Sequence, residues 1–212
     1  MNCRSLQKLL AYWNEVRRGR LAPRRFEIEP SRIAELLPDT FILERVDAET
    51  YRFRLAGTRM CELLGSELRG SGFLDSWRAA DRSALTGQLS IMSFQGAVGY
   101  FTLEAVAADG RSADFEILLL PLIHSPDTID RFLGIIAPID PPIWLGAVRF
   151  ERRQLLSSEL IWPDGRPHSI VERLGHQAPF LPEVRNARIV RADRRAFRVY
   201  DGGLAKSGGD EA

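Results

Sequence analysis

Two apolar runs on either side of a short polar turn form the most regular hydrophobic pattern of the chain. Phe115–Ile123 and Phe132–Ile139 each have the length of a strand, and Pro126 and Asp127 between them are turn-forming residues. Side chains of the first run alternate between two faces, which hold Phe115, Ile117 and Leu119 on one side and Leu118, Leu120 and Leu122 on the other. A hairpin that is apolar on both faces must be covered on both faces. The pattern therefore predicts helices on one face and a further helix, or a second subunit, on the other.

An amphipathic helix is predicted over Ser5–Arg18, with Ser5 as N-cap and Gly19 as stop signal. Its apolar stripe follows the i, i+3, i+4 spacing and consists of Leu6, Leu9, Leu10, Trp13 and Val16. We expect this stripe to cover the outer face of the sheet, over Leu118, Leu120 and Phe132. A helix of about 14 residues reaches ~21 Å, or roughly three strands. The helix is too short to cover the whole outer face of the sheet, and the apolar surface that remains predicts a homodimer. The alternative is that the helix packs only within its own monomer.

The middle of the chain alternates between short strand and helix patterns. These are helix 32–37, strands 41–46 and 51–55, helix 59–64, helix 77–94 and strand 98–107. Asp109 and Gly110 then form a two-residue hairpin turn into the central hairpin. This order predicts an α+β domain in which 41–140 forms a five-stranded antiparallel sheet, with helices on one face inserted between the second and third strands.

The pattern weakens after Pro141 and Pro142, and Leu145–Leu156 fits either a strand or a helix. The expected organisation is an N-terminal helix (1–20), an α+β domain (21–142), an irregular C-terminal extension of unknown fold (143–200) and a disordered polar tail (201–212).

Composition excludes several classes of protein. The 212 residues are 45% hydrophobic and carry a net charge of +1, which gives no general attraction to nucleic acid or acidic membranes. The N-terminus is too charged for a signal peptide, and no apolar run approaches the roughly 18 residues of a membrane span. Cys3 and Cys61 show no metal-ligand spacing and are expected to be free thiols. We therefore expect a cytoplasmic protein that does not contact membranes.

Several strings resemble a bacterial PAS family in which the domain makes up most of a small protein. They are LLAYWNEVRRGRLAPRRFEIEP, LLPDTFILERV, RFRLAGTRMCELLGSELRG, EILLLPLI and RFLGIIAP, and they extend from Leu6 to Pro138. The resemblance implies a PAS-like fold, a sensory or interaction module, and a ligand or an empty pocket between the helices and the concave sheet face. It also implies dimerisation through an N-terminal helix, and it carries over no catalytic residues.

Strand parity and the inner face of the longer helix predict which residues would line such a pocket. They are Phe53, Leu55, Phe73, Trp77, Leu89, Met92, Phe101, Ile117 and Leu133. All are apolar or aromatic, so the expected ligand is small and apolar or planar.

The residue pattern disfavours haem and flavin, and it leaves the cofactor unknown. Haem-binding PAS domains use a histidine on a pocket-facing helix, whereas His124, His168 and His176 lie outside the predicted inner helices. The surroundings of Cys61 do not match the string of a flavin-adduct PAS domain, and a small buried hydrophobe is its simplest interpretation. The chain contains no nucleophile-elbow, phosphate-loop or zinc-protease motif, so no catalytic or metal-binding residues are predicted.

Two arginine-rich patterns have ordinary interpretations. Arg52 and Arg54 share the outer face of a strand, and ion pairing with Glu44 is more plausible than contact with a partner. The string ADRRAFRV mixes arginine with an aromatic residue, but the net charge of +1 argues against nucleic-acid binding.

Three functions follow from these patterns. The first is a non-enzymatic PAS sensor or adaptor that binds a small molecule or a regulatory protein partner. The second is a ligand-free structural or interaction module whose core is filled by its own bulky residues. The third is an unrecognised small-molecule enzyme, for which only the C-terminal region leaves room.

Overall fold

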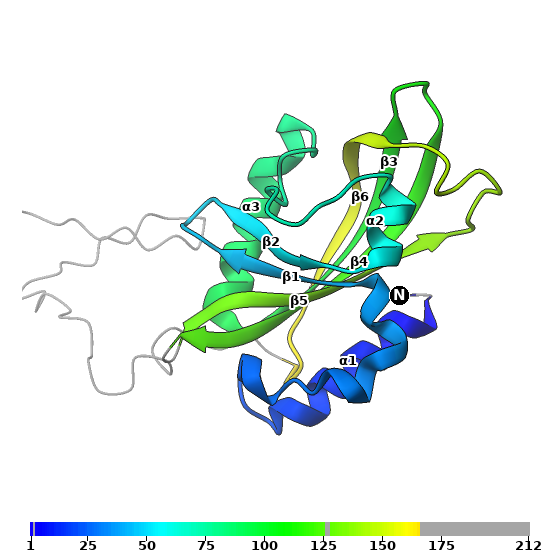
Figure 1. Cartoon of the computed structure of the whole chain (residues 1–212). Helices are drawn as coiled ribbons and strands as arrows, with labels where there is room; N and C mark the ends of the chain where they lie inside the picture. The colour runs from blue at the N-terminus through cyan, green and yellow to red at the C-terminus, as the bar shows by residue number, and fades with distance from the viewer. Residues whose placement is uncertain (2, 126–127, 166–212) are drawn as a thin grey trace, which may run out of the picture. The chain divides into compact units, whose positions relative to one another are not determined.

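Six antiparallel strands form one sheet in the computed structural model, which describes residues 1, 3–125 and 128–165. The strands are β1 (Thr40–Arg45), β2 (Tyr51–Ala56), β3 (Val98–Ala107), β4 (Ser112–Ser125), β5 (Thr128–Ile139) and β6 (Phe150–Ile161). Their order across the sheet is β2-β1-β5-β4-β3-β6. The predicted antiparallel α+β fold is confirmed, and its first five strands lie where the sequence pattern placed them (Figure 1).

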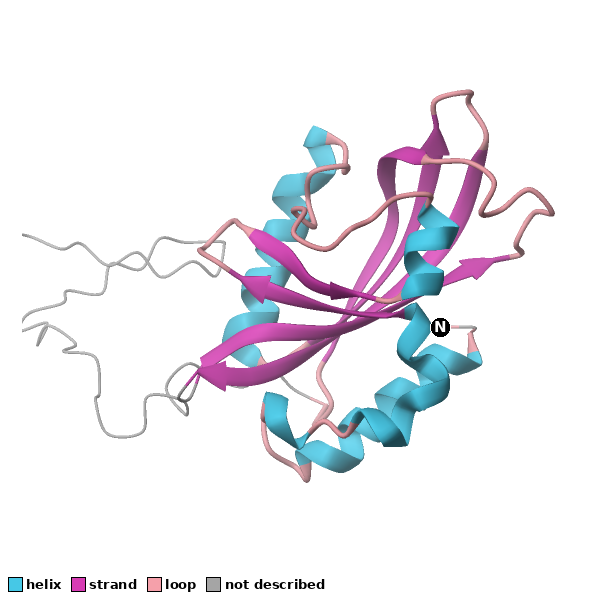
Figure 2. Cartoon of the chain, in the orientation of Figure 1, coloured by secondary structure: helices cyan, strands magenta, loops and turns pink. Residues whose placement is uncertain are grey.

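Helices lie on both sides of this sheet, as the two-faced hairpin requires. They are α1 (Arg4–Arg17), the 3₁₀ segments η1 (Arg25–Glu27) and η2 (Pro30–Asp39), α2 (Thr58–Leu64) and α3 (Ala79–Gln95). Figure 2 shows α1 along one side of the strands and α2 and α3 on the other. We call the face toward α3 the inner face and the face toward α1 the outer face.

The long β4–β5 hairpin is the centre of the sheet and is buried on both faces. On the inner face Ile117 pairs with Ile136, and on the outer face Leu118 pairs with Ile135. All four side chains are at most 2% exposed. The connecting residues 126–127, where the turn was predicted, lie outside the described residues.

The sixth strand corrects two predictions. Phe150–Ile161 pairs with β3 from Ala107 to Val98, so the sheet has six strands rather than five. This part of the C-terminal extension is therefore regular strand, not irregular chain. Charged and polar residues alternate irregularly along β6, because two bulges shift its register, and the period-2 signal is lost. The predicted tail, 201–212, lies outside the described residues.

Short backbone segments pair with one stretch of each edge of the sheet. Beside β6, the Arg153 amide donates to the Ser76 carbonyl at 2.7 Å, and the Arg78 amide donates to the Arg153 carbonyl at 3.0 Å. Beside β2, the Phe73 amide donates to the Tyr51 carbonyl at 2.7 Å. Covered edges prevent open-ended pairing with other chains. Because Trp77 pairs with Arg153 at the edge of β6, the chain is extended there. The helix α3 therefore begins at Ala79 rather than at Trp77.

Candidate functional site

The predicted pocket residues form a packed aromatic and aliphatic core. Seven of the nine lie on the inner side and are at most 2% exposed: Phe53, Phe73, Trp77, Leu89, Met92, Phe101 and Ile117. Ring centroids are 5.8 Å apart both for Phe53 with Phe73 and for Phe73 with Trp77. Phe41, which the parity argument omitted, joins this row at 5.4 Å from Phe53. These spacings are those of contacting rings, so this end of the core is filled by side chains.

The other two predicted pocket residues lie on the outer face. Arg54 is an extra residue at a bulge in the β1–β2 ladder, so Leu55 pairs with outer-face Ile42 and is 46% exposed. Leu133 pairs with Ile42 and with Leu120, and this places it toward α1. The assignment of Leu55 and Leu133 to an inner pocket was therefore wrong, because bulge and register, not residue type, decide parity.

The stripe of α1 packs on the outer face of its own sheet. Leu6, Leu9 and Trp13 have no exposed surface, whereas Leu10 and Val16 are only partly buried. The Cys3 amide, just before α1, donates to outer-face Glu116 at 2.6 Å. Three stripe residues are thus already covered within one chain, which is the alternative that the sequence left open.

Phe132 corrects the predicted footprint of α1. It pairs with Leu43 and Pro121, and its ring centroid is 5.9 Å from that of inner-face Tyr51. Phe132 therefore faces inward. On β5, Leu133 and Ile135 are the residues that lie on the outer face opposite Leu120 and Leu118.

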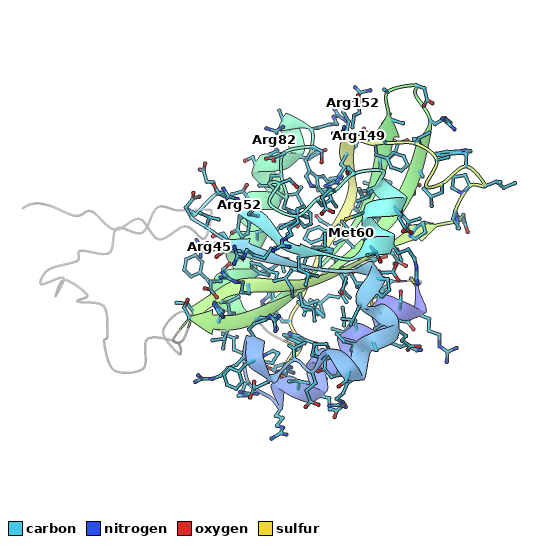
Figure 3. The ribbon with its side chains drawn as sticks, in the orientation of Figure 1. Arg45, Arg52, Met60, Arg82, Arg149 and Arg152 are labelled. Atoms are coloured by element: carbon cyan, nitrogen blue, oxygen red, sulfur yellow. The ribbon has the colours of Figure 1, made fainter. Side chains whose placement is uncertain are left out.

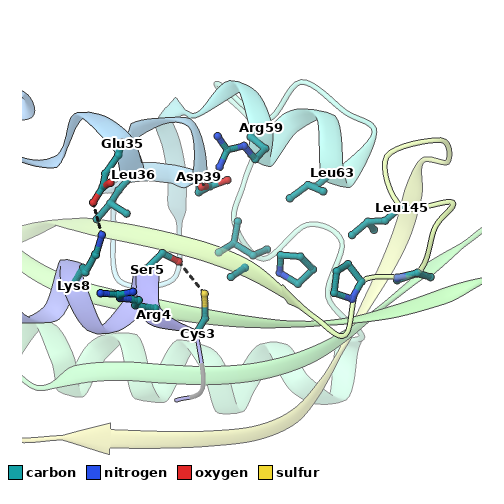
Figure 4. A pocket seen from close by; sticks show the side chains of 15 residues that line it. Cys3, Arg4, Ser5, Lys8, Glu35, Leu36, Asp39, Arg59, Leu63 and Leu145 are labelled. Atoms are coloured by element: carbon teal, nitrogen blue, oxygen red, sulfur yellow. Dashed lines mark hydrogen bonds and ion pairs between the residues drawn. The ribbon is translucent and has the colours of Figure 1, made fainter.

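An open groove of about 660 Å³ lies at the end of the sheet where α1 begins (Figure 4). Its walls come from the start of α1, from η2, from α2, from the end of β5 and from the following loop. The apolar part of the lining is Leu36, Leu63, Ile136, Ala137, Pro138, Pro141, Pro142 and Leu145. Ile143, in the same loop, is fully exposed. An apolar groove bordered by an exposed aliphatic side chain is typical of a protein-binding surface.

Two ion pairs border this groove. The Lys8 ammonium lies 2.6 Å from Glu35, and the Arg59 guanidinium lies 2.7 Å from Asp39. Burial raises the pKa of the Asp39 carboxyl, and Arg59 opposes that shift only in part. The two charges of each pair offset each other, so the apolar lining supplies most of what the groove can recognise, with Arg4 as a further charge on the rim.

Sequence reasoning missed the groove, although one signal pointed to it. Pro138, Pro141 and Pro142 cluster within five positions and end the last strand of the predicted domain. Their apolar rings line the groove together with Leu63 of α2, which was read only as part of a short helix. The contact of these two segments with the start of α1 could not be read from the chain order.

Other candidate residues have local partners. Glu44 pairs with Arg54 at 3.2 Å and with Arg131 at 2.8 Å, in agreement with the ion-pair interpretation of this strand. Cys61 lies on α2, half-buried, with its sulfur 3.9 Å from a carboxylate oxygen of Glu67. Burial raises the pKa of the Cys61 thiol, so it is a weak nucleophile at neutral pH. His168, His176 and the string ADRRAFRV lie outside the described residues.

Within residues 1, 3–125 and 128–165, no group of three or more His, Cys, Asp and Glu side chains is placed to hold a metal ion. In the same residues, no helix has the length and apolar character needed to cross a membrane.

The comparisons with known proteins identify the family. A sequence model described as a PAS domain matches residues 1–137. The chain belongs to the PAS domain family. This PAS protein has no match among curated proteins.

Two solved structures are similar to this chain at low identity. The LOV protein of Rhodobacter sphaeroides is 15% identical with a TM-score of 0.42, over 68% of this chain and 71% of that one. The PAS domain of an HTR-like protein from Haloarcula marismortui is 24% identical with a TM-score of 0.38, over 51% of this chain and 96% of that one. The family match extends from α1 to the end of β5, so β6 lies beyond the matched residues.

Proposed function

We propose that this PAS protein is a non-enzymatic signalling adaptor that binds a segment of a regulatory protein in the groove between α1, η2, α2 and the 141–145 loop. The observation that carries the proposal is the combination of a filled inner core with an open apolar groove. Phe41, Phe53, Phe73 and Trp77 occupy the inner side with ring-to-ring contacts. Recognition at the groove needs no cavity inside the core.

The shape and chemistry of the groove favour a short apolar segment of a protein. Leu63 of α2 and Leu145 of the loop both line it (Figure 4). Arg4 lines the rim at the start of α1 and has no ion pair among the described residues. A leucine-rich segment that also carries one acidic residue would match both the lining and Arg4.

Site-specific photo-crosslinking tests the groove. A benzoylphenylalanine at position 145 should cross-link one protein in the native host, and the same group at position 156 should not. Leu156 is a matched control because it is apolar and 49% exposed but lies on β6. Leu63→Asp should abolish the cross-link from position 145, since it puts a charge into the apolar lining.

Equal cross-linking from positions 145 and 156, or a cross-link that survives Leu63→Asp, would contradict the proposal. The near-ultraviolet circular dichroism of Leu63→Asp must match that of the parent protein, so that loss of binding is not loss of fold.

Homodimerisation and a cytoplasmic location are part of the proposal. The fully buried stripe residues Leu6, Leu9 and Trp13 would not form the dimer interface, whereas Leu10 and Val16 retain some surface. Light scattering of the parent and of Leu10→Asp tests this assignment: a dimer mass that falls to the monomer mass in the variant supports it.

A further inference from the structure

Arg153 on β6 is a buried cation without a partner in the described part of the chain. The residue is 6% exposed, and no carboxylate there lies within 4.0 Å of its guanidinium. Only its backbone groups form hydrogen bonds, with Ser76 and Arg78. Burial lowers the pKa of Arg153 to about 10, and the negative charge of Asp75 offsets only part of this shift. An arginine remains charged at neutral pH, so its isolation from acceptors requires an explanation.

A second buried donor lies beside it. Trp77 and Arg153 are bridged in parallel, so their side chains leave the same face of the sheet from backbones ~4.8 Å apart. Trp77 is 2% exposed, and its indole Nε1 has no hydrogen-bond partner among the described residues. Indole and guanidinium groups only donate. A buried donor left unpaired destabilises the folded state. The Trp77 indole is therefore a nearby probe of what binds at Arg153.

Arg153 lines a pocket of about 380 Å³ between the start of β6 and the connector from α2 to α3. Its other lining residues are Ser66, Glu67, Leu68, Ser71, Gly72, Asp75, Ser76, Arg149, Phe150 and Glu151. Arg149, labelled in Figure 3, directly precedes β6. Leu68 and Phe150 supply buried apolar surface.

Charge limits what the pocket can accept. Two lining arginines face three lining carboxylates. Two of these carboxylates are engaged in the connector: Asp75 accepts from the Gly72 amide at 2.8 Å and Glu67 from the Arg69 amide at 3.0 Å. The three carboxylates repel a dianion such as phosphate about twice as strongly as a monoanion, so a single negative charge directed at Arg153 is favoured. A planar carboxylate also matches the fork of a guanidinium.

We propose that this pocket binds a small monocarboxylate with an apolar body, whose carboxylate accepts from the Arg153 guanidinium while its body packs on Leu68 and Phe150. Arg153, Arg149 and Phe150 lie beyond the residues that match the PAS family. The site is separate from the groove, so either assignment can fail without the other.

Benzoate is a suitable probe, and the four indole N–H groups are the reporters. In nitrogen-labelled full-length protein at constant ionic strength, sodium benzoate should shift the Trp77 indole cross-peak saturably. The Trp13 and Trp162 cross-peaks should stay fixed, because those indoles donate to the Pro121 carbonyl and to Gln95. Neutral benzamide and sodium phosphate should leave Trp77 unchanged.

Arg153→Met should abolish the Trp77 shift, and Arg152→Met is the matched control that should retain it. Arg152 is the next residue of β6 and pairs with Val106 on the opposite face. An unmoved Trp77 cross-peak at 100-fold excess of benzoate, an equal shift with benzamide or phosphate, or a shift that survives Arg153→Met would overturn the proposal. If the Trp13 cross-peak shows that Arg153→Met is unfolded, Arg153→Lys decides: it should weaken binding at least tenfold, and unchanged binding would refute the site.

Discussion

The indole of Trp13 donates a 2.9 Å hydrogen bond to the carbonyl of Pro121, 108 residues further along the chain. Trp13 lies on α1 and Pro121 on β4, and Trp13 has no exposed surface. This bond fixes the helix on the outer face at one position along the hairpin. Its buried setting makes it stronger than a comparable bond in water.

Trp13→Phe should destabilise the protein by about 2 kcal/mol, because it leaves the Pro121 carbonyl unpaired and removes part of a filled core. Urea unfolding followed by circular dichroism measures the change. Trp144→Phe is the control, since Trp144 is only partly buried and lies in a loop; its effect should be less than half as large. Equal effects of the two variants would show that the bond to Pro121 adds nothing.

Gly134 and Gly87 should respond to alanine in opposite directions. A Cβ at Gly134 on β5 would overlap the ring of Phe41, so Gly134→Ala should destabilise by about 1–3 kcal/mol. Gly87 is on the exposed side of α3, where a Cβ meets nothing within 4 Å, so Gly87→Ala should stabilise by about 0.5–1 kcal/mol. Thermal unfolding of the two variants and the parent shows whether each substitution lowers or raises the stability of the protein. A neutral Gly134→Ala would mean that Phe41 can move aside without cost.

Tyr100 should titrate well above the ordinary phenol pKa of about 10. Partial burial and its 2.8 Å hydrogen bond to Glu116 raise the pKa of Tyr100 to about 12. A raised pKa favours the protonated phenol in the folded state, so this stabilisation is complete below about pH 10 and is lost between pH 10 and 12. Tyrosinate absorbance at 295 nm, compared with Tyr100→Phe, measures the titration. A step near pH 10 that disappears in Tyr100→Phe would contradict this assignment.

Asp39 should show a carboxyl pKa above its ordinary value of 3.8, because burial outweighs its ion pair with Arg59. The protonated form is then favoured by folding, and the parent loses stability relative to Asp39→Asn as the pH rises through the Asp39 pKa. Urea unfolding of both proteins between pH 3 and 7 gives this difference, and carbon-detected titration gives the pKa itself. Asp47 is the internal reference and should titrate below 3.8. Hydrogen bonds from the Glu49 amide and from the hydroxyl and amide of Thr50 lower its pKa.

The sequence alone determined most of the fold, because local signals agreed along the chain. The stripe Leu6, Leu9 and Trp13 has helical spacing, the Asp109–Gly110 turn joins β3 to β4, and the apolar runs from Phe115 mark the central hairpin. Each signal depends on neighbours within a few residues, and the family strings depend on the same local patterns. Buried inner residues such as Phe53 and Phe101 followed from strand parity, since their strands lack a bulge before them.

Tertiary structure decided the rest, because register, bulges and long-range contact have no local signature. The extra residue Arg54 turned Leu55 outward, and the β4–β5 register exchanged the faces expected for Phe132 and Leu133. A hairpin apolar on both faces gives the sequence no means of choosing between two registers one residue apart. Only pairing along the edge of β6 put Trp77 beside Arg153, 76 residues later, and only packing brought Leu63, Pro141 and the start of α1 around one groove.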